Sequence, residues 1–416
     1  MPSTDDAAAA LAEQVARRSY GRLVAFLTMR TRDIAQAEDA LSEAFAAALS
    51  HWPRDGVPAN PEAWLLTTAR RRLIDGSRRQ ATHEAAAIEL EVLAQPAFAG
   101  APGAAPEIPD ERLRLLFACA HPGIAPALRA PLMLQTVLGF DAAAIASAFR
   151  VAPATMGQRL ARGKARIREA GIPFRVPDLH ELPERLDAVL AAIYATYSEG
   201  WSDPGGTQPQ RRALAEEALW LGRLVATLLP DEPEALGLVA LMLYLDSRRG
   251  ARRDDAGEFV PLEAQDPARW DATLIDQAEA LLRRAALSQR IGRYQLEAAL
   301  QSAHAERRRG RGADARAIVR LYDALLELTG SPVVAINRAV ALASGEGAPA
   351  GLAALDAVAA DPRIADYQPY WAARAELLAR AGQHARASEA YSRAIGLEID
   401  PAVRRFLLRR ATAIGG

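Results

Sequence analysis

Hydrophobic positions along this chain recur at intervals of three and four residues, and the alternating stretches that would indicate β-strands are scarce. Apolar residues at that spacing fall on one face of an α-helix, so the pattern predicts an all-α protein. Alanine and leucine, which favour helices, are abundant, whereas runs of β-branched residues are rare. In the first part of the chain we expect helices near residues 8–30, 33–51, 60–79 and 83–93.

Stretches rich in proline and glycine divide this helical pattern. Residues 94–109, AQPAFAGAPGAAPEIP, contain four prolines, two glycines and one charged residue, a composition typical of a flexible linker. Proline also punctuates a second connector further along the chain. The predicted organisation is a helical unit at 1–93, the linker at 94–109, a second helical unit at 110–171, the connector at 172–183 and a helical extension at 184–416.

The extension contains a repeat signal. Seven residues stand at successive offsets of 4, 3, 4, 5, 4 and 3, namely Trp371, Ala375, Leu378, Gly382, Ala387, Tyr391 and Ala394. This spacing is that of the tetratricopeptide helix pair, whose period is about 34 residues and whose small residues let two antiparallel helices approach closely. Fainter copies occur at 305–324 and 345–362, so we expect a helical solenoid. Two interpretations stay open: a concave face that binds a protein or peptide ligand, and a stack that only supports the first half of the chain.

A basic segment stands at residues 154–168, ATMGQRLARGKARIR, which carry five basic residues and no acidic one, although the formal net charge of the chain is −1. Wound as a helix, the segment separates its polar residues from an apolar face of Met156, Leu160 and Ile167. A short helical pattern and the break RVAP precede it, as in a helix-turn-helix whose second helix enters the DNA major groove. An ordinary amphipathic helix with a solvated basic face is the alternative. The candidate DNA-contacting residues are Thr155, Gln158, Arg159, Arg162, Lys164 and Arg166.

A second candidate nucleic-acid surface lies in residues 33–79. There an acidic amphipathic helix leads into a proline-broken loop and then into a basic helix. Unstacked bases can rest on aromatic surfaces, at about 1–3 kcal/mol per base, while arginines hold the phosphates. Either tryptophan taken alone is more typical of a hydrophobic core. The candidate residues are Trp52, Arg54, Asp55, Asn60, Trp64, Arg70, Arg71, Arg72, Arg78 and Arg79.

These segments together resemble a known family. AEDALSEAF, HWP and PEAWLLTTARRRLID, followed after the linker by the stretch FACAHPG to KARIR, are similar to bacterial RNA polymerase sigma factors of the sigma-70 family. The resemblance is to the extracytoplasmic-function (ECF) type, in particular the subgroup with a long tetratricopeptide-like C-terminal extension. In the extension, YSEGW, LEAQDPARWD, YQLEAALQSAHA and SPVVAINRAVA resemble that subgroup, although Ser198 and Trp201 replace its usual Asn and Tyr.

The resemblance implies sigma region 2 at 1–93 and region 4 at 110–171. Region 2 would bind the β′ clamp helices of the polymerase core through Asp39, Leu41, Glu43 and Phe45. The loop 52–61 and the arginines of the next helix would hold the melted −10 element. Helix 153–167 would read the −35 element, although its cap position is Ala152, and replacing a Ser or Thr cap by Ala typically costs about 1 kcal/mol.

The implied function is to direct core RNA polymerase to promoters for transcription initiation, with a regulatory extension. The implied partners are promoter DNA and the polymerase core, through its β′ clamp helices and β flap, while the linker would thread the RNA-exit path. The nearer alternative is a helix-turn-helix regulator with a tetratricopeptide-like sensor that acts without core polymerase. Residues 33–79 favour the first interpretation, since a simple regulator has no use for them.

Enzymatic chemistry has little support in the sequence. It contains no glycine-rich phosphate loop, no GxSxG elbow and no HExxH. His180 and Glu184 have a spacing that could hold a metal, but they lie at the connector, and Cys119 near His121 is typical of a buried helix residue. We therefore expect no catalytic residue, no cofactor and no metal.

The chain also lacks the marks of export or membrane insertion. It has one cysteine, no signal-peptide pattern at its start and no apolar run long enough to span a membrane. A cytoplasmic protein without a membrane partner is the expectation.

Overall fold

The computed structural model describes residues 4–80, 111–149, 151–178, 181–201, 209–310 and 314–415. Over these residues the regular structure is helical, without a β-strand, apart from one isolated bridge between Arg253 and Phe259. The all-α prediction is therefore confirmed. The chain divides into two compact units: unit 1 comprises Met1–Ser202 and Gln210–Ala218, and unit 2 comprises Asp203–Pro209 and Leu219–Gly416.

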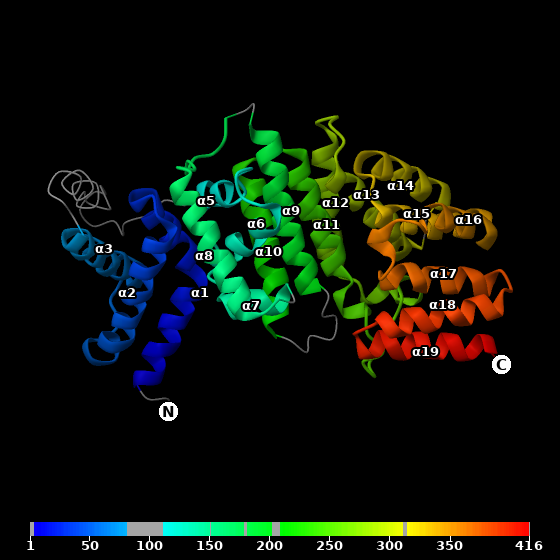
Figure 1. Cartoon of the computed structure of the whole chain (residues 1–416), viewed down its shortest axis with the longest axis horizontal. Coiled ribbons are helices and arrows are strands. Elements are labelled where there is room, and N and C mark those ends of the chain that lie inside the picture. The colour runs from blue at the N-terminus through cyan, green and yellow to red at the C-terminus, as the bar shows by residue number, and fades with distance from the viewer. Residues whose placement is uncertain are drawn as a thin grey trace. The chain divides into compact units, whose positions relative to one another are not determined.

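Unit 1 contains two groups of helices, coloured blue and cyan to green in Figure 1. The first group is α1 (Thr4–Thr31), α2 (Ile34–Asp55) and α3 (Pro61–Gln80); the second is α5 (Arg112–Cys119), α6 (Pro126–Thr136), α7 (Ala142–Ala148), α8 (Pro153–Glu169), α9 (Leu182–Trp201) and the first half of α10 (Pro209–Leu228). In the first group the three helices pack on one another, and in the second α6 contacts α5, α7, α8 and α9.

The helices of the first group match the predicted pattern, with one correction. α2 was expected to end near residue 51, but it continues to Asp55 and includes Pro53 in its last turn. The backbone N–H of Gly56 donates to the carbonyl of Trp52 at 3.1 Å, and the Trp52 side chain is buried, so core packing extends the helix past the proline. The expected helix at 83–93 and the linker at 94–109 lie outside the described residues.

The extension expected from residue 184 is not separate from the front half. α9 packs on α5 and α6, and the buried Arg185 donates from Nη2 to the carbonyl oxygen of Phe117 at 2.6 Å. The division between the two units falls inside α10 instead. The first helix of the expected extension therefore belongs to unit 1.

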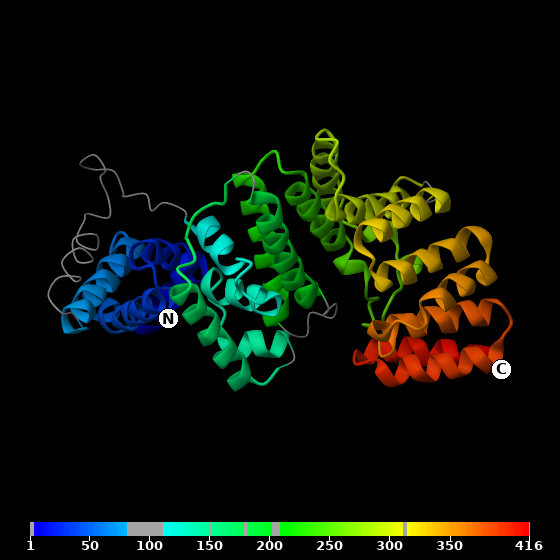
Figure 2. The ribbon, with the colours of Figure 1, turned by 45° about the horizontal axis from the view of Figure 1, so that its top comes forward.

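Unit 2 consists of consecutive helices, several of them paired as hairpins, as Figure 2 shows. After the second half of α10 its elements are α11 (Pro233–Ser247), η1 (Arg249–Ala251), η2 (Leu262–Ala264), η3 (Pro267–Arg269), α12 (Ala272–Ala286), α13 (Arg293–Ala305), η4 (Glu306–Arg309), α14 (Ala315–Thr329), α15 (Pro332–Glu346), α16 (Ala348–Val358), η5 (Pro362–Ile364), α17 (Gln368–Arg380), α18 (His384–Leu397) and α19 (Pro401–Gly415). α11 is buried on nearly every side, as its continuous apolar sequence requires.

The helix pair expected at 368–401 is present as α17 and α18. Five of the seven residues that predicted it lie in one buried cluster: Ala375, Leu378, Ala387, Tyr391 and Ala394. Gly382 has a φ of 74° in the turn between the helices, a conformation that favours glycine. The small alanines let the two helices approach closely, which is the packing that the spacing predicts.

The last helix of unit 2 is tied to a loop from its first part. The carboxylate of Glu258 accepts hydrogen bonds from Arg405 at 2.7 Å and Arg409 at 2.6 Å. Beside them, the rings of Phe259 and Phe406 meet edge to face at 5.5 Å. These contacts connect positions nearly 150 residues apart, so α19 is joined to an early loop of unit 2.

Candidate nucleic-acid interface

α8 packs against the rest of unit 1 through an apolar face. The buried residues of the helix are Met156, Leu160, Gly163 and Ile167. At Gly163 the helix lies close to α6, where an added Cβ would come within 2.9 Å of Leu132 Cδ1. No side chain caps the helix at Ala152, and Pro153 occupies its first turn. The amphipathic helix predicted over 153–167 is therefore present, with its polar side facing away from this packing.

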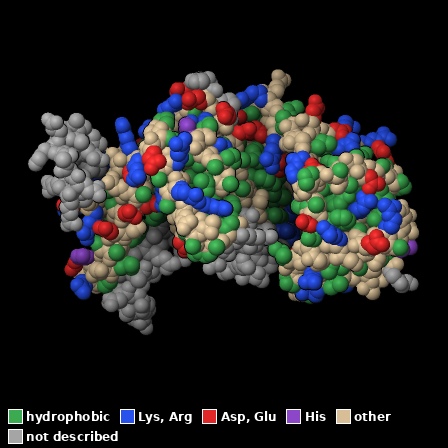
Figure 3. Space-filling view, in the orientation of Figure 1, with side chains coloured by type: hydrophobic (Ala, Val, Ile, Leu, Met, Phe, Trp, Pro, Cys, Tyr) green, Lys and Arg blue, Asp and Glu red, His purple; other side chains and the backbone are tan. Residues whose placement is uncertain are grey.

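The opposite side of α8 is a basic face, formed by Thr155, Gln158, Arg159, Arg162 and Arg166. Arg159 is half-buried and the other four are exposed. No residue that the structure describes forms an ion pair with these three arginines. Figure 3 shows Lys and Arg side chains over α8 on the visible face. Arginines without acidic partners are available to hold phosphates or to address base edges.

Lys164 departs from the expected pattern because it points toward α2. Its Nζ lies 2.6 Å from Oε2 of Glu38, and the two side chains are only 14% and 10% exposed. One turn further along α8, Arg168 Nη1 lies 3.0 Å from Oδ2 of Asp33, which also caps α2. The expectation that Lys164 contacts a phosphate is not met in this arrangement, since its ammonium group is engaged inside unit 1.

The Glu38 carboxylate is held in an unfavourable environment. Burial raises its pKa, and the attraction of Lys164 opposes this shift without cancelling it. Its Oε1 atom is buried and has no hydrogen-bond partner among the described residues. A buried ion pair of this kind contributes little net stability, although removal of one partner leaves a costly buried charge.

A second contact joins the two helix groups of unit 1. An added Cβ on Gly21 of α1 would lie 1.7 Å from the carbonyl oxygen of Val137, directly after α6. Next to it, an added Cβ on Gly139 would lie 2.7 Å from the Tyr20 ring. Burial, with smaller effects from Glu38, raises the pKa of the Tyr20 hydroxyl. Only glycine at position 21 permits this close approach.

The turn between α2 and α3 presents polar groups from both helix ends. Arg54 and Asp55 are exposed at the end of α2, rather than in the loop where they were expected. Asn60 accepts a hydrogen bond from the backbone N–H of Ala63 at 3.0 Å through its side-chain oxygen. The Asn60 oxygen therefore caps α3, and residues 56–60 form the connecting turn.

The two tryptophans of this region differ in exposure. Trp52 is 2% exposed and meets Trp64 edge to face, with ring centroids 5.6 Å apart. Its indole N–H is buried and has no partner among the described residues. Trp64 is half-buried and also lies beside His51. In this structure Trp52 is a core residue, so Trp64 is the aromatic group that remains for a base, and the expectation for Trp52 as a direct contact is not met.

The arginines of α3 also differ in exposure. Arg71 and Arg72 are exposed, and Arg72 Nε lies 3.3 Å from Glu43 Oε2 at the surface. Arg70 is half-buried, and burial lowers its pKa. The side chains of Arg78 and Arg79 lie outside the described residues. Arg71 and Arg72 are therefore the described arginines of α3 that are exposed at this surface.

The expected polymerase-binding residues do not share one face of α2. Asp39 and Glu43 are exposed, and Phe45 is half-buried. Leu41, in contrast, is 0% exposed within the core of unit 1. Residues two positions apart on a helix point in different directions. Leu41 is therefore not available to a partner in this structure, and its contact with the polymerase stays a prediction.

The cysteine considered for thiol chemistry is buried and is not arranged for it. Cys119 is buried beside the Thr136 hydroxyl at 3.4 Å, and burial raises its pKa to about 12. The Nδ1 atom of His121 accepts from the backbone N–H of Gly123 at 3.0 Å. Among the described residues no cluster of His, Cys, Asp and Glu could hold a metal, and His180 lies outside them. None of the described helices combines the length and apolar character that a membrane crossing needs.

The comparison with known families finds a match in the front half of the chain. Residues 15–83, which include α2 and α3, match the family described as Sigma-70 region 2. This region-2 match supports a sigma-factor role in transcription initiation, with core RNA polymerase and promoter DNA as partners.

Two further similarities extend beyond region 2. Residues 185–286 match a family of unknown function, DUF6596. An uncharacterized protein of Rhizobium meliloti (strain 1021) is 40% identical over 371 residues, which are 88% of this chain and 87% of that protein. No solved structure matches the chain. The similarity thus extends over both units, well beyond region 2.

The sequence reasoning missed the partners of α8. Asp33 and Glu38 were recognised only as part of an acidic helix, whereas they hold the basic helix through Arg168 and Lys164. A signal was present, because Lys164 is the single lysine in a chain whose other basic residues are arginines. A lysine ammonium is compact, and it fits a narrow buried site better than a guanidinium.

Proposed function

We propose that the chain is a sigma factor of the ECF type with a tetratricopeptide-like extension, and that it binds a promoter at two places. The basic face of α8, as the second helix of a region-4 helix-turn-helix, would read the −35 element. The turn 56–60 with Trp64, Arg71 and Arg72 would hold the melted −10 strand. The exposed Asp39 and Glu43 would face the β′ clamp helices.

One observation carries the proposal. The region-2 match and an exposed helix with three arginines that no described acidic residue neutralises lie in the same chain. Bidentate contacts of arginine or lysine to guanine are the commonest specific contact to DNA, and arginine is also among the residues that contact phosphates. An ordinary solvated helix face would more often alternate positive and negative residues.

The contact between α2 and α8 supports a further part of the proposal. While Lys164 pairs with Glu38, the helix for the −35 element and the helix for the clamp are held together in unit 1. Promoter binding at two separated elements would require this contact to open. We therefore expect the free chain to bind promoter DNA poorly until core polymerase separates the two helix groups.

Run-off transcription with core polymerase over a genomic promoter library tests the function. The chain should support initiation only with core enzyme, and Arg162→Gln should reduce initiation at least fivefold, since one base contact contributes about 1–3 kcal/mol. Arg316→Gln, which changes an exposed arginine of α14, is the matched control. Tight, sequence-specific binding without core polymerase would instead favour the regulator with a tetratricopeptide-like sensor.

For the extension from residue 184 we propose a stabilising and regulatory role. The buried bond from Arg185 to the Phe117 carbonyl supports the stabilising part, because α9 completes the packing around α5 and α6. A chain that ends at 180 should therefore lose solubility, whereas one that ends at 201 should keep more of it. Equal solubility and transcription from both shortened chains and the full chain would contradict this role.

A further inference from the structure

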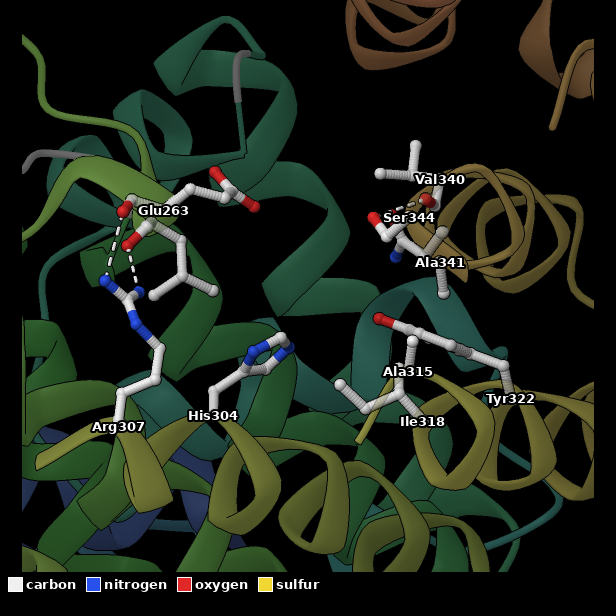
Figure 4. Close-up of a pocket in the computed structure, with 11 residues that line it drawn as sticks. Glu263, His304, Arg307, Ala315, Ile318, Tyr322, Val340, Ala341 and Ser344 are labelled. Atoms are coloured by element: carbon white, nitrogen blue, oxygen red, sulfur yellow. Dashed lines mark hydrogen bonds between the residues drawn. The ribbon is translucent and has the colours of Figure 1, made fainter. Parts of the chain in front are cut away.

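Unit 2 contains a cavity that neither region 2 nor the α8 surface involves. It has a volume of about 420 Å³ and lies among η2, α13, α14 and α15, as Figure 4 shows. This volume falls in the usual range for small-molecule sites, about 300–1,000 Å³. The cavity therefore has room for a ligand larger than a few water molecules.

The floor of the cavity is apolar. Ile318 of α14 and Ala341 of α15 line it and also belong to a buried cluster with Leu296, Leu300 and Leu325. Val340 extends the same surface on α15. A ligand seated here would bury an aliphatic part against packed side chains, which favours binding in proportion to the apolar area removed from water.

Three polar groups at the cavity have no hydrogen-bond partner among the described residues: the His304 ring, the Tyr322 hydroxyl and the Asn337 amide. Burial lowers the pKa of His304 to about 4 and raises that of Tyr322 to about 12, so both are neutral near pH 7. Each of the three groups can then both donate and accept a hydrogen bond. Amide and hydroxyl groups of a ligand would satisfy them.

The two guanidinium groups near the cavity donate to acceptors of the protein. The Arg307 guanidinium donates to the carbonyl oxygens of Leu262 at 2.6 Å, Glu263 at 3.0 Å and Gln265 at 3.3 Å, which turns its donors away from the opening (Figure 4). Arg248, the other cation near His304, donates to Gln301 at 2.7 Å. Among the described residues, these hydrogen bonds of Arg307 and Arg248 therefore go to protein acceptors and not into the cavity.

A single carboxylate supplies the opposite charge. Glu263 lies on η2, its side chain is exposed, and Figure 4 shows its carboxylate on the cavity side. It forms no ion pair with any residue in the described part of the chain. A protonated amine above the apolar floor would find its counter-ion there.

We propose that this cavity binds a primary amine attached to an apolar body that carries an amide group. Apolar amino-acid amides and the amino ends of peptides share this chemistry. The ammonium group pairs with Glu263, the amide meets Asn337 and Tyr322, and the apolar side chain rests on Ile318. The proposal is independent of how unit 1 binds DNA.

Isothermal titration of the full chain with leucinamide tests the recognition. Leucinamide should bind, and N-acetyl-leucinamide, which lacks the charge, should bind at least fivefold more weakly. Glu263→Gln should weaken leucinamide about fivefold, as expected for one exposed charge pair. The control is Glu327→Gln. Glu327 is also an exposed glutamate, but it lies on α14, and this variant should bind leucinamide as the wild type does.

Blocking the opening provides a second variant that does not depend on Glu263. Ser344→Trp adds bulk at an exposed position on the rim and should abolish binding. Ser392→Trp is matched to it, because Ser392 is also exposed and also donates to a carbonyl of its own helix at 3.0 Å. Equal binding by both tryptophan variants would overturn the site, as would equal affinity for leucinamide and its acetylated form.

The source of the ligand is decided by a third probe, the tripeptide amide Leu-Ala-Ala-NH2. Affinity at least tenfold above that of leucinamide would support a peptide amino end, and equal affinity would support a free small molecule. If neither probe binds at millimolar concentration, the proposal is refuted.

Discussion

Replacement of Lys164 by alanine should release α8 from α2. The change leaves the Glu38 carboxylate 10% exposed, with Oε1 already lacking a partner, so the contact must either bury a lone charge or take up a proton. Loss of one partner of a buried pair costs about 3–5 kcal/mol. Arg168→Ala removes the neighbouring pair with Asp33, but Arg168 is 56% exposed, so its loss should cost no more than about 1 kcal/mol.

Protonation of Glu38 sets an upper limit on the free energy that the contact between α2 and α8 loses in Lys164→Ala. Taking up a proton at pH 7 costs about 3 kcal/mol for a carboxyl group with the ordinary pKa of 4.5. At pH 5 the same step costs less than about 1 kcal/mol. Burial raises the pKa of Glu38, so the protonated form is favoured in the contact and the contact gains stability as the pH falls.

The expected readout is a pH-dependent opening. At pH 7 a loss of about 3 kcal/mol shifts the ratio of joined to separated helices by about a hundredfold, whereas at pH 5 the shift is only a few-fold. Positions 46 on α2 and 161 on α8 are exposed. Spin labels attached to Ala46→Cys and Ala161→Cys would report the distance between the two helices by pulsed electron paramagnetic resonance. The native Cys119 is buried, and its raised pKa of about 12 protects it from labelling.

Two results would refute this reasoning. One is a distance distribution in Lys164→Ala at pH 7 that matches the wild type. The other is equal opening in Lys164→Ala and Arg168→Ala, because burial is the physical difference between the two pairs.

The remaining predictions concern close packing and a buried histidine. Gly21→Ala should destabilise unit 1 by about 1–3 kcal/mol in thermal unfolding, since the new methyl would overlap the Val137 carbonyl; Gly157→Ala, with nothing within 4 Å of the added atom, should leave stability equal or slightly higher. Wild-type stability should fall relative to His304→Gln by up to about 3 kcal/mol as the pH drops from 6.5 to 4. The unfolded chain takes up a proton in this range that the buried ring, whose pKa is lowered to about 4, refuses. A constant difference across that range in pH-dependent denaturation would count against the buried, neutral ring.

The local pattern of apolar and polar residues was sufficient to predict much of the fold. The amphipathic face of α8 and the hairpin of α17 and α18 follow from a helical period that any short window of sequence displays. The basic face of α8 was found for the same reason, because the direction of each side chain around one helix depends only on its position.

The tertiary structure decided which residues are available to partners. Periodicity places Leu41 and Trp52 on the apolar face of α2, but it could not show which helices cover that face. Nor could it pair Lys164 with Glu38, whose positions are 126 residues apart. The unit boundary inside α10 and the cavity beside His304 arise in the same way. A helix is specified by neighbours in sequence, whereas the partner of a charge and the walls of a cavity are specified by elements that only folding brings together.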